Sequence, residues 1–448
     1  MKTVFFIAYE FPPLNVGGVQ RPLKFTKYLS NFNVKPVVFS LDSGCYPKVF
    51  REYDIDINTA NDIPQDVDVI RVPSEDILQL KKRPVRNFIE SYFSIVPKEA
   101  AGWRKNIFSI FEEYLPLYQP DVLIVTAPPF SIACLAVELS KRFKLPLILD
   151  MRDAWSGWNM SPYGSYLHYQ LTLRAERRCF EAADAIIGTS DQTIENFKRL
   201  HPSIAKEKFS LITNGYDKNI SDWSMVSPSI NKKEFVIGYV GSFYYSPETR
   251  QLMFTPWWKK FGHRKLQYVP CKEDWLYRSP YFFFKAIRTL IDDQPKLSSR
   301  IKVKFAGNKP EWIDSMVEKF GLSSVVSFVG RISHAESLEF QSSCDALLLT
   351  SSKVIGGNDY SIAGKTFEYV MAKKAIVGFV TEGAQKRILA QLGTALICDP
   401  DDSNASAHSL SQLISGDWKP KPDVFFLNSL HRKELTKKLS NIIHNVAG

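Results

Sequence analysis

Short apolar runs alternate with longer mixed segments along the whole chain. The runs at 3–9 (TVFFIAY) and 34–41 (VKPVVFSL) are apolar almost throughout, which is typical of strands buried on both faces of a parallel sheet. Segments such as 131–143 (SIACLAVELSKRF) lie between them and carry apolar residues at helical spacing. This alternation predicts βαβ units, and therefore an α/β protein built on parallel sheets.

The pattern occurs in two successive arrays. The first has predicted strands at 3–9, 34–41, 66–73, 120–129, 146–153 and 185–190, and it ends with 209–217; the second has them at 235–243, 302–308, 326–331, 346–351 and 375–380. Two doubly wound, Rossmann-like domains fit this arrangement. We expect the first over 1–217, a polar linker over 218–234, the second over 235–424, and a terminal helical segment over 425–448.

An insertion of about residues 244–280, rich in tryptophan and cations, interrupts the second array between its first strand and its first helix. It leaves the carboxyl end of a strand, where ligands bind in open α/β sheets. A lid or a docking surface is one interpretation. A surface hairpin without function is the alternative, because loops vary freely in sequence.

Composition and charge narrow the class of protein. With 448 residues, of which 45% are apolar and 23% charged, the chain has the profile of a folded protein of more than one domain. The net charge of +10 suits anionic partners such as nucleotides or lipid headgroups, and we expect no nucleic-acid partner. The six cysteines form no CxxC pair, which predicts free thiols in the cytoplasm. We expect no membrane-spanning segment.

The loop after the first strand, EFPPLNVGGVQR, contains Gly17 and Gly18 and ends in Arg21. Two glycines permit a positive φ and a close approach of the backbone to a ligand. Amides before a helix favour a phosphate, and Arg21 adds a cation. The alternative is a tight turn without a ligand.

The loop after LILD places Asp150, Arg152 and Asp153 at a strand end. Charges at such a position cost free energy unless they are paired or used. Arg152 and Asp153 are candidates for a catalytic role, and a mutual ion pair is equally open.

The second array offers Gly241 and Ser242 after its first strand, and Lys365 and Glu368 at the start of a later helix. A lysine in the first turn of a helix opposes the helix dipole, so it is a poor choice for stability unless an anion binds there. Glu368 is placed to accept hydrogen bonds from a ribose. A surface pair between the two side chains is the alternative.

The chain resembles the GT-B superfamily of glycosyltransferases, and within it the large retaining family 4 of capsule, exopolysaccharide and lipopolysaccharide enzymes. The residues that carry the resemblance are, in order, YEFPPLNVGGVQR, LILDMRDAW, AADAIIGTS, ITNGYD, YVGSF, CDALLLTS and GKTFEYVMAKKAIVG. The resemblance implies two Rossmann-like domains that face each other across a cleft. It further implies a nucleotide-diphosphate sugar as donor, a glycan or lipid-linked acceptor, and a last helix that crosses back to the first domain.

Several residues match the family pattern. Glu368 matches the second glutamate of its E-x7-E motif, but the first falls at Tyr360, with Asn358 and Asp359 nearby as substitutes. Gly17 and Gly18 match the loop near the donor phosphates. The family usually has two cations over the diphosphate, and the insertion obscures which residues correspond to them. Arg278 is our first choice for one of them, with Arg250 next. Arg152 or Asp153 would face the transferred sugar.

We expect transfer without a metal or other cofactor, because helix N-termini, amides and cations aimed at the diphosphate can stabilise its developing charge. Other functions stay open: a non-catalytic protein that binds sugar nucleotides, or a nucleotide-sugar epimerase of the same fold. A Rossmann oxidoreductase would need GxGxxG after the first strand, which is missing. Segment 80–111 mixes cations with aromatics around Trp103. It suits peripheral contact with an anionic membrane or, alternatively, an ordinary helix that buries its aromatics.

Overall fold

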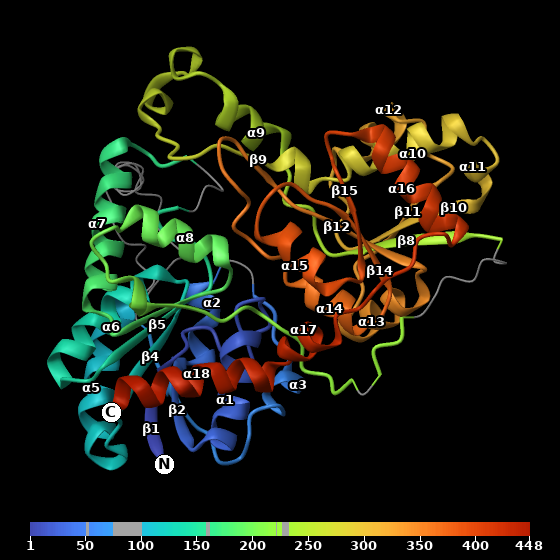
Figure 1. Ribbon diagram of the computed structural model, residues 1–448. Helices are drawn as coiled ribbons and strands as arrows, with labels where there is room; N and C mark the ends of the chain where they lie inside the picture. Colours follow the sequence, from blue (N-terminus) through green and yellow to red (C-terminus); the bar gives the residue numbers. More distant parts are fainter. Residues whose placement is uncertain (51–52, 75–100, 158–161, 221, 226–232) are drawn as a thin grey trace. The chain divides into compact units, whose positions relative to one another are not determined.

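The computed structural model describes residues 1–448 except 51–52, 75–100, 158–161, 221 and 226–232. The chain divides into two compact units (Figure 1). The first comprises residues 1–217, 256–270 and 430–448, and the second comprises residues 218–255 and 271–429. The linker predicted over 218–234 falls in the second unit, and residues 221 and 226–232 of it lie outside the described residues.

A seven-stranded sheet forms the centre of the first unit, with strand order β3-β2-β1-β4-β5-β6-β7. All neighbouring strands are parallel, and β1 pairs with β4 from Val4↔Val122 to Ile7↔Val125. The strand order reverses beside β1, as it does in doubly wound folds. The strands are β1 (Lys2–Ile7), β2 (Val34–Leu41), β3 (Asp68–Val72), β4 (Val122–Ala127), β5 (Leu147–Met151), β6 (Ala185–Gly188) and β7 (Phe209–Leu211).

Helices cover both faces of this sheet, which explains why its strands are apolar on both sides. Phe5 and Phe39 point to one face, where they meet Phe111 of α5, whereas Phe6 and Ile124 belong to the core on the other face. The helices are α1 (Gln20–Leu29), α2 (Tyr46–Val49), α3 (Ile57–Ala60), α5 (Ala101–Tyr118), α6 (Phe130–Phe143), α7 (Tyr166–Ala182), α8 (Asp191–Leu200) and α18 (Arg432–Ala447).

The last helix of the chain, α18, packs beside α1 in the first unit (Figure 1). Its residues Leu435, Leu439 and Ile443 are fully or almost fully buried and join the same core as Phe6. Their i, i+4, i+8 spacing places them on one face of the helix. The terminal helix therefore completes the first sheet.

The second unit contains a six-stranded sheet of order β11-β10-β8-β12-β14-β15, in which all neighbours are again parallel. Its strands are β8 (Phe235–Val240), β10 (Ile301–Ala306), β11 (Val326–Gly330), β12 (Ala346–Thr350), β14 (Ala375–Phe379) and β15 (Ala395–Cys398). The helices are α9 (Pro247–Phe254), α10 (Tyr281–Asp293), α11 (Leu297–Arg300), α12 (Ile313–Lys319), α13 (His334–Ser343), α14 (Lys365–Met371), α15 (Ala384–Leu392), α16 (Ser403–Ser415) and α17 (Val424–Ser429). The sheet's core includes Phe283, Phe284 and Leu410 of α10 and α16.

The insertion contributes to both units. In the second unit, α9 is followed by the short strand β9 (Glu273–Asp274), which pairs antiparallel with β13 (Lys353–Val354). Residues 256–270 belong to the first unit, where Tyr163 and Tyr268 exchange both backbone hydrogen bonds. The insertion therefore supplies residues to both units and is not a surface hairpin confined to the second one.

Most predicted strands agree with the structure. The helix α7 begins at Tyr166, where Ser165 caps it by accepting a hydrogen bond from the backbone N–H of His168. β15 was not predicted, because its four residues (ALIC) are too short a run to stand out.

The membrane interpretation of segment 80–111 is not supported where the structure describes it. Residues 80–100 lie outside the described residues. Trp103, in α5, is fully buried and donates its indole N–H to the Val72 carbonyl at 3.0 Å, so it belongs to the core rather than to a lipid surface. Among the residues that the structure describes, no helix is both long and apolar enough to cross a bilayer.

Candidate functional site

Lys365 lies at the carboxyl end of β8 in the second unit. Its ammonium donates to the Val240 carbonyl at 2.9 Å and sits 3.6 Å from the ring centroid of Tyr239. Gly241, the next residue, has φ +109°, and a Cβ there would lie 3.3 Å from Lys365 Nζ. Glycine is thus required by backbone conformation and by space. Ser242 is exposed, and its carbonyl accepts from the Tyr239 hydroxyl at 3.1 Å.

The environment of Lys365 disfavours its charge. Burial, with a contribution from Arg278, lowers the pKa of Lys365 to about 7 against the opposing effect of Glu368. An anion that binds beside this side chain would favour its charged form. The role of Lys365 towards a donor phosphate stays a prediction.

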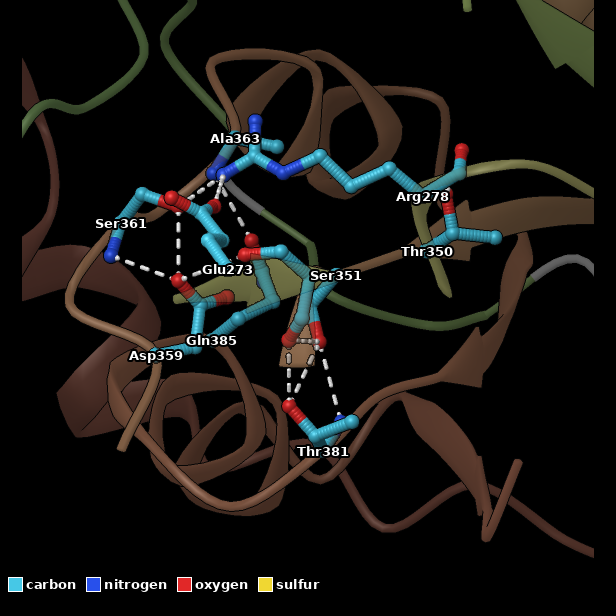
Figure 2. Close-up of polar contacts among 10 residues, drawn as sticks. Glu273, Arg278, Thr350, Ser351, Asp359, Ser361, Ala363, Thr381 and Gln385 are labelled. Atoms are coloured by element: carbon cyan, nitrogen blue, oxygen red, sulfur yellow. Dashed lines mark hydrogen bonds and ion pairs between the residues drawn. The ribbon is translucent and has the colours of Figure 1, made fainter. Parts of the chain in front are cut away.

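A second group of charges surrounds Arg278 (Figure 2). Its Nη2 donates to Ser361 Oγ at 2.5 Å and lies 3.7 Å from Glu273 Oε1. The guanidinium also sits 4.9 Å from the ring centroid of Trp275. Asp359 Oδ1 accepts from the backbone N–H of Ser361 at 3.1 Å. Arg278 is thus held beside two carboxylates, one from the strand β9 and one from the loop that precedes α14.

Asp359 and Glu273 are almost completely buried, with 1% and 2% of their surfaces exposed. Burial, with a contribution from Glu273, raises the pKa of Asp359 to about 6 against the opposing effect of Arg278. For Arg278, burial lowers the pKa, but Asp359 and Glu273 raise it and prevail. The cluster therefore contains a carboxyl group that changes charge near neutral pH.

Several polar atoms of the second unit lack a hydrogen-bond partner within the described residues, although they are buried. They are both carboxylate oxygens of Glu273, Trp275 Nε1, Arg278 Nε, Gln341 Oε1 and Asp359 Oδ2. A buried polar group without a partner costs about 1–3 kcal/mol, so native proteins rarely keep such a set without a use. Four of these atoms are acceptors on carboxylate or amide groups, which bind hydroxyls well.

Glu368 follows Lys365 by one helical turn in α14 and is partly buried. Its Oε2 accepts from Gln341 Nε2 at 3.4 Å, and Gln341 is fully buried in α13. The long contact leaves the carboxylate able to accept another donor. This placement is compatible with the expected contact to a ribose, which stays a prediction.

In the first unit, Arg21 is engaged in an internal ion pair. Its Nη2 lies 2.7 Å from Asp150 Oδ1, with both side chains almost fully buried, and its Nη1 donates to the Thr213 carbonyl at 2.9 Å. Thr126 Oγ1 also donates to Asp150, at 2.9 Å. These bonds join α1 to β4, β5 and the loop after β7, and the role of Arg21 towards a donor phosphate stays a prediction.

Arg152 secures the glycine loop. It donates to the carbonyls of Gly18 and Pro128, and its Nη2 lies 3.1 Å from Glu10 Oε2. A Cβ on Gly18 would lie 2.1 Å from Arg152 Nη1, so a larger residue there would displace the Arg152 side chain. Neither Gly18 nor Gly17 has a positive φ, contrary to our expectation, and space around Gly17 is open.

Asp153 directly follows Arg152 after β5 and is partly exposed. Arg152 forms an ion pair with Glu10. The catalytic assignment of the two residues stays a prediction. Their position at the carboxyl edge of the sheet is the one at which α/β proteins place functional groups.

Three residues of the site escaped the sequence analysis: Glu273, Tyr239 and Gln341. Glu273 is buried only because β9 pairs with β13, and no local pattern signals that pairing. Arg250, the second choice for a phosphate contact, instead forms a two-point ion pair with Asp274 at 2.7 and 2.8 Å. The structure thus favours Arg278 over Arg250 as the cation of this site.

Comparisons with known proteins agree with this fold. A family model described as a glycosyl transferase 4-like domain matches residues 65–215, and one for glycosyl transferases group 1 matches residues 280–425. No curated protein matches the chain.

Three solved structures illustrate the likeness in fold. Anabaena HepE in complex with UDP has a TM-score of 0.58 at 12% identity, covering 99% of this chain and 100% of that one. WaaG, a glycosyltransferase involved in lipopolysaccharide biosynthesis, has a TM-score of 0.54 at 14% identity, covering 98% and 99%. A trehalose 6-phosphate synthase from Burkholderia multivorans has a TM-score of 0.56 at 11% identity, covering 100% and 99%.

Two parallel-sheet α/β units and these likenesses define a GT-B fold. With a family 4-like model over the first unit and a group 1 model over the second, the chain belongs to the GT-B glycosyltransferases of family 4 type. It is an enzyme of that class.

Proposed function

We propose that this glycosyltransferase moves a sugar from a nucleotide-diphosphate sugar to a glycan or lipid-linked acceptor, with retention of anomeric configuration and without a metal. We further propose a role in the synthesis of a surface polysaccharide. The observation that carries the proposal is that two cations, Lys365 and Arg278, share one electrostatically coupled group of the second unit with buried carboxylates, several oxygens of which accept no hydrogen bond within the described residues.

Lys365 and Arg278 would stabilise the leaving diphosphate, whose departure is the difficult step of the reaction. As the sugar leaves, negative charge develops on the diphosphate, and preorganised donors aimed at that charge lower the barrier. Lys365 and Arg278 are fixed by bonds to the Val240 carbonyl and to Ser361 Oγ, so little reorganisation is needed. Each removed donor of this kind typically costs about 10²–10³ in kcat.

The carboxylates would recognise the hydroxyl groups of the donor. Glu273, Asp359 and Glu368 present oxygens that the protein leaves partly or wholly without donors. Sugar and ribose hydroxyls are the natural donors to such groups. Asp359 is adjacent to Tyr360, where the family motif has its first glutamate, and we propose that Asp359 and Glu273 together take over its role.

The solved neighbours support the donor class. One HepE structure contains UDP and another contains UDP-glucose, and WaaG is described as acting in lipopolysaccharide biosynthesis. By analogy we propose a nucleotide-diphosphate sugar as the donor here, and a surface glycan or its lipid-linked precursor as the acceptor.

A donor screen tests the proposal directly. Thermal shift against UDP-, GDP-, ADP- and CMP-sugars should show one base that stabilises the protein, and Glu368→Ala should abolish most of that shift while Glu339→Ala, in α13, should not. Proton NMR of the product should then show the donor's anomeric configuration, and the activity should survive EDTA. Inversion, or activity restored only by added metal, would contradict the corresponding part.

The same screen separates the alternatives. A protein that binds a donor but neither transfers nor hydrolyses the sugar would be a non-catalytic binding partner, as the missing first glutamate could suggest. Conversion of one nucleotide sugar into its epimer without any acceptor would identify an epimerase. Either outcome would replace the proposed reaction while leaving the donor-binding residues in place.

A further inference from the structure

The insertion exposes a set of aromatic side chains that the sugar-transfer chemistry does not use. Residues 256–266, here called the aromatic–basic loop, form two short 3-10 turns over Trp257–Lys259 and Gly262–Leu266. Trp257 and Trp258 are 63% and 62% exposed, Phe261 is 88% exposed and Leu266 is 62% exposed. Four large apolar side chains within ten residues are thus presented to solvent, which a soluble surface normally avoids.

The same loop is strongly basic. Lys259, Arg264 and Lys265 are all exposed, and between Glu248 and Glu273 the sequence contains no aspartate or glutamate. The aromatic side chains therefore lie among cations without any neighbouring acid in the sequence to neutralise them. This charge is complementary to an anionic surface.

The base of the loop is firmly held, although its tip is exposed. Tyr268 exchanges backbone hydrogen bonds of 3.0 and 2.9 Å with Tyr163. Its ring packs 4.9 Å from that of Tyr166 and 5.0 Å from that of Tyr169, near the N-terminal end of α7. Figure 1 shows the loop extending beyond this end of α7. A fixed base means that the exposed side chains are displayed in a defined position rather than on a free tail.

We propose that the aromatic–basic loop is a docking element for an anionic lipid bilayer. Tryptophan combines an apolar body with a polar N–H, which suits the zone between headgroups and acyl chains. Lysine and arginine beside it bind anionic headgroups, and their attraction adds to the apolar burial. Phe261 and Leu266 have no polar group with which to read a nucleotide base, and their exposure favours a lipid phase over a nucleic acid.

Vesicle flotation of the full chain tests the proposal. We expect binding to phosphatidylcholine vesicles that contain phosphatidylglycerol, weaker binding to pure phosphatidylcholine, and a partial loss at high salt because exposed charges are screened. K259E/R264E/K265E should lower the partition coefficient on the order of 10²-fold, the scale of three lost cation contacts. W257A/W258A/F261A should remove the part of the binding that salt leaves intact.

Matched controls are available elsewhere on the chain. K433E/K437E/K438E reverses three exposed charges on α18, and V424A/F425A removes exposed apolar side chains on α17. Both controls should bind vesicles like the wild type, and all variants should keep the wild-type melting temperature. Because no donor or acceptor is present, the result is separate from the proposed sugar transfer.

Four outcomes would overturn the proposal. Equal binding to neutral and anionic vesicles would show that the cations of the loop do not contribute to binding. Wild-type binding by both loop variants would show that the loop is not the docking element. A single-stranded oligonucleotide that competes the protein off the vesicles would assign the loop to nucleic acid. Dimerisation that is seen by light scattering and lost in W257A/W258A/F261A would assign it to a second copy of the chain.

Discussion

The most informative perturbation of the candidate site is the deprotonation of Lys365. Burial holds the pKa of this lysine at about 7, so the free enzyme loses the charge at mildly alkaline pH. A diphosphate placed beside the ammonium favours the charged form and raises its pKa. Donor binding is therefore linked to uptake of a proton, and affinity should be highest below pH 7 and should fall as pH rises.

The size of the effect follows from the same pKa. If the bound lysine stays protonated throughout, the dissociation constant grows as one plus ten to the power of pH minus pKa. With a pKa of about 7, affinity should fall about 30-fold between about pH 6 and pH 8.5. A bound-state pKa within this range would flatten the curve at its alkaline end, so the figure is an upper value.

Isothermal titration calorimetry with a nucleotide-diphosphate sugar provides the assay, because both of its phosphates are esterified and do not titrate near neutrality. Lys365→Met should bind more weakly at pH 6 and lose the slope above pH 7. Lys309→Met, which removes an exposed lysine of the same unit, should keep both. A wild-type affinity that is constant over this range, or a slope that persists in Lys365→Met, would refute the assigned role.

Further predictions concern the same unit and the core. Burial raises the pKa of Asp359 from its ordinary value of 3.8 to about 6, so the folded state binds more protons than the unfolded state between these values, and stability should fall as pH rises through that window. D359N should therefore raise the free energy of unfolding at pH 7 by up to about 3 kcal/mol, with no gain at pH 4; equal gains at both would contradict the burial argument. Gly241→Ala and Gly330→Ala both place alanine at a positive φ, +109° and +88°, and each should cost about 1–3 kcal/mol in a thermal melt. Only Gly241→Ala should also weaken donor binding, since a Cβ at Gly330 meets nothing within 4 Å; equal donor affinities would argue against the Lys365 contact. Trp103→Ala should cost about 3–5 kcal/mol in denaturant unfolding because the indole is fully buried, whereas a lipid-facing tryptophan would leave stability unchanged.

The sequence predicted the sheets well, because parallel strands buried on both faces are continuous apolar runs. The strand expected at 34–41 has those limits in the structure. Lys365 was chosen because a cation in the first turn of a helix is unfavourable without an anion, and its role stays a prediction. Gly18 was chosen for close approach to a ligand, which also stays a prediction, and the structure places the Arg152 side chain against it.

Other features could not be predicted because they depend on contacts between distant segments. Glu273 becomes buried only when β9 pairs with residues 353–354, and a lone glutamate in a loop carries no signal of that pairing. Arg21 looked like a phosphate ligand beside two glycines, yet Asp150, far along the chain, binds it at 2.7 Å. A charged residue at the end of a strand indicates that the position matters for the protein. It does not indicate which residue or ligand the charge contacts.

The return of α18 to the first sheet has a consequence for dissecting this enzyme. The backbone N–H of Tyr216 donates to the Leu430 carbonyl, and that of Arg432 donates to the Tyr216 carbonyl, so the polypeptide departs from the first sheet and rejoins it at one spot. A fragment that stops at residue 217 would leave the seats of Leu435, Leu439 and Ile443 empty and should aggregate. Splicing residue 217 to residue 430 through a few glycines should instead restore α18 to the sheet, and the resulting fragment would lack only residues 256–270 of the first unit.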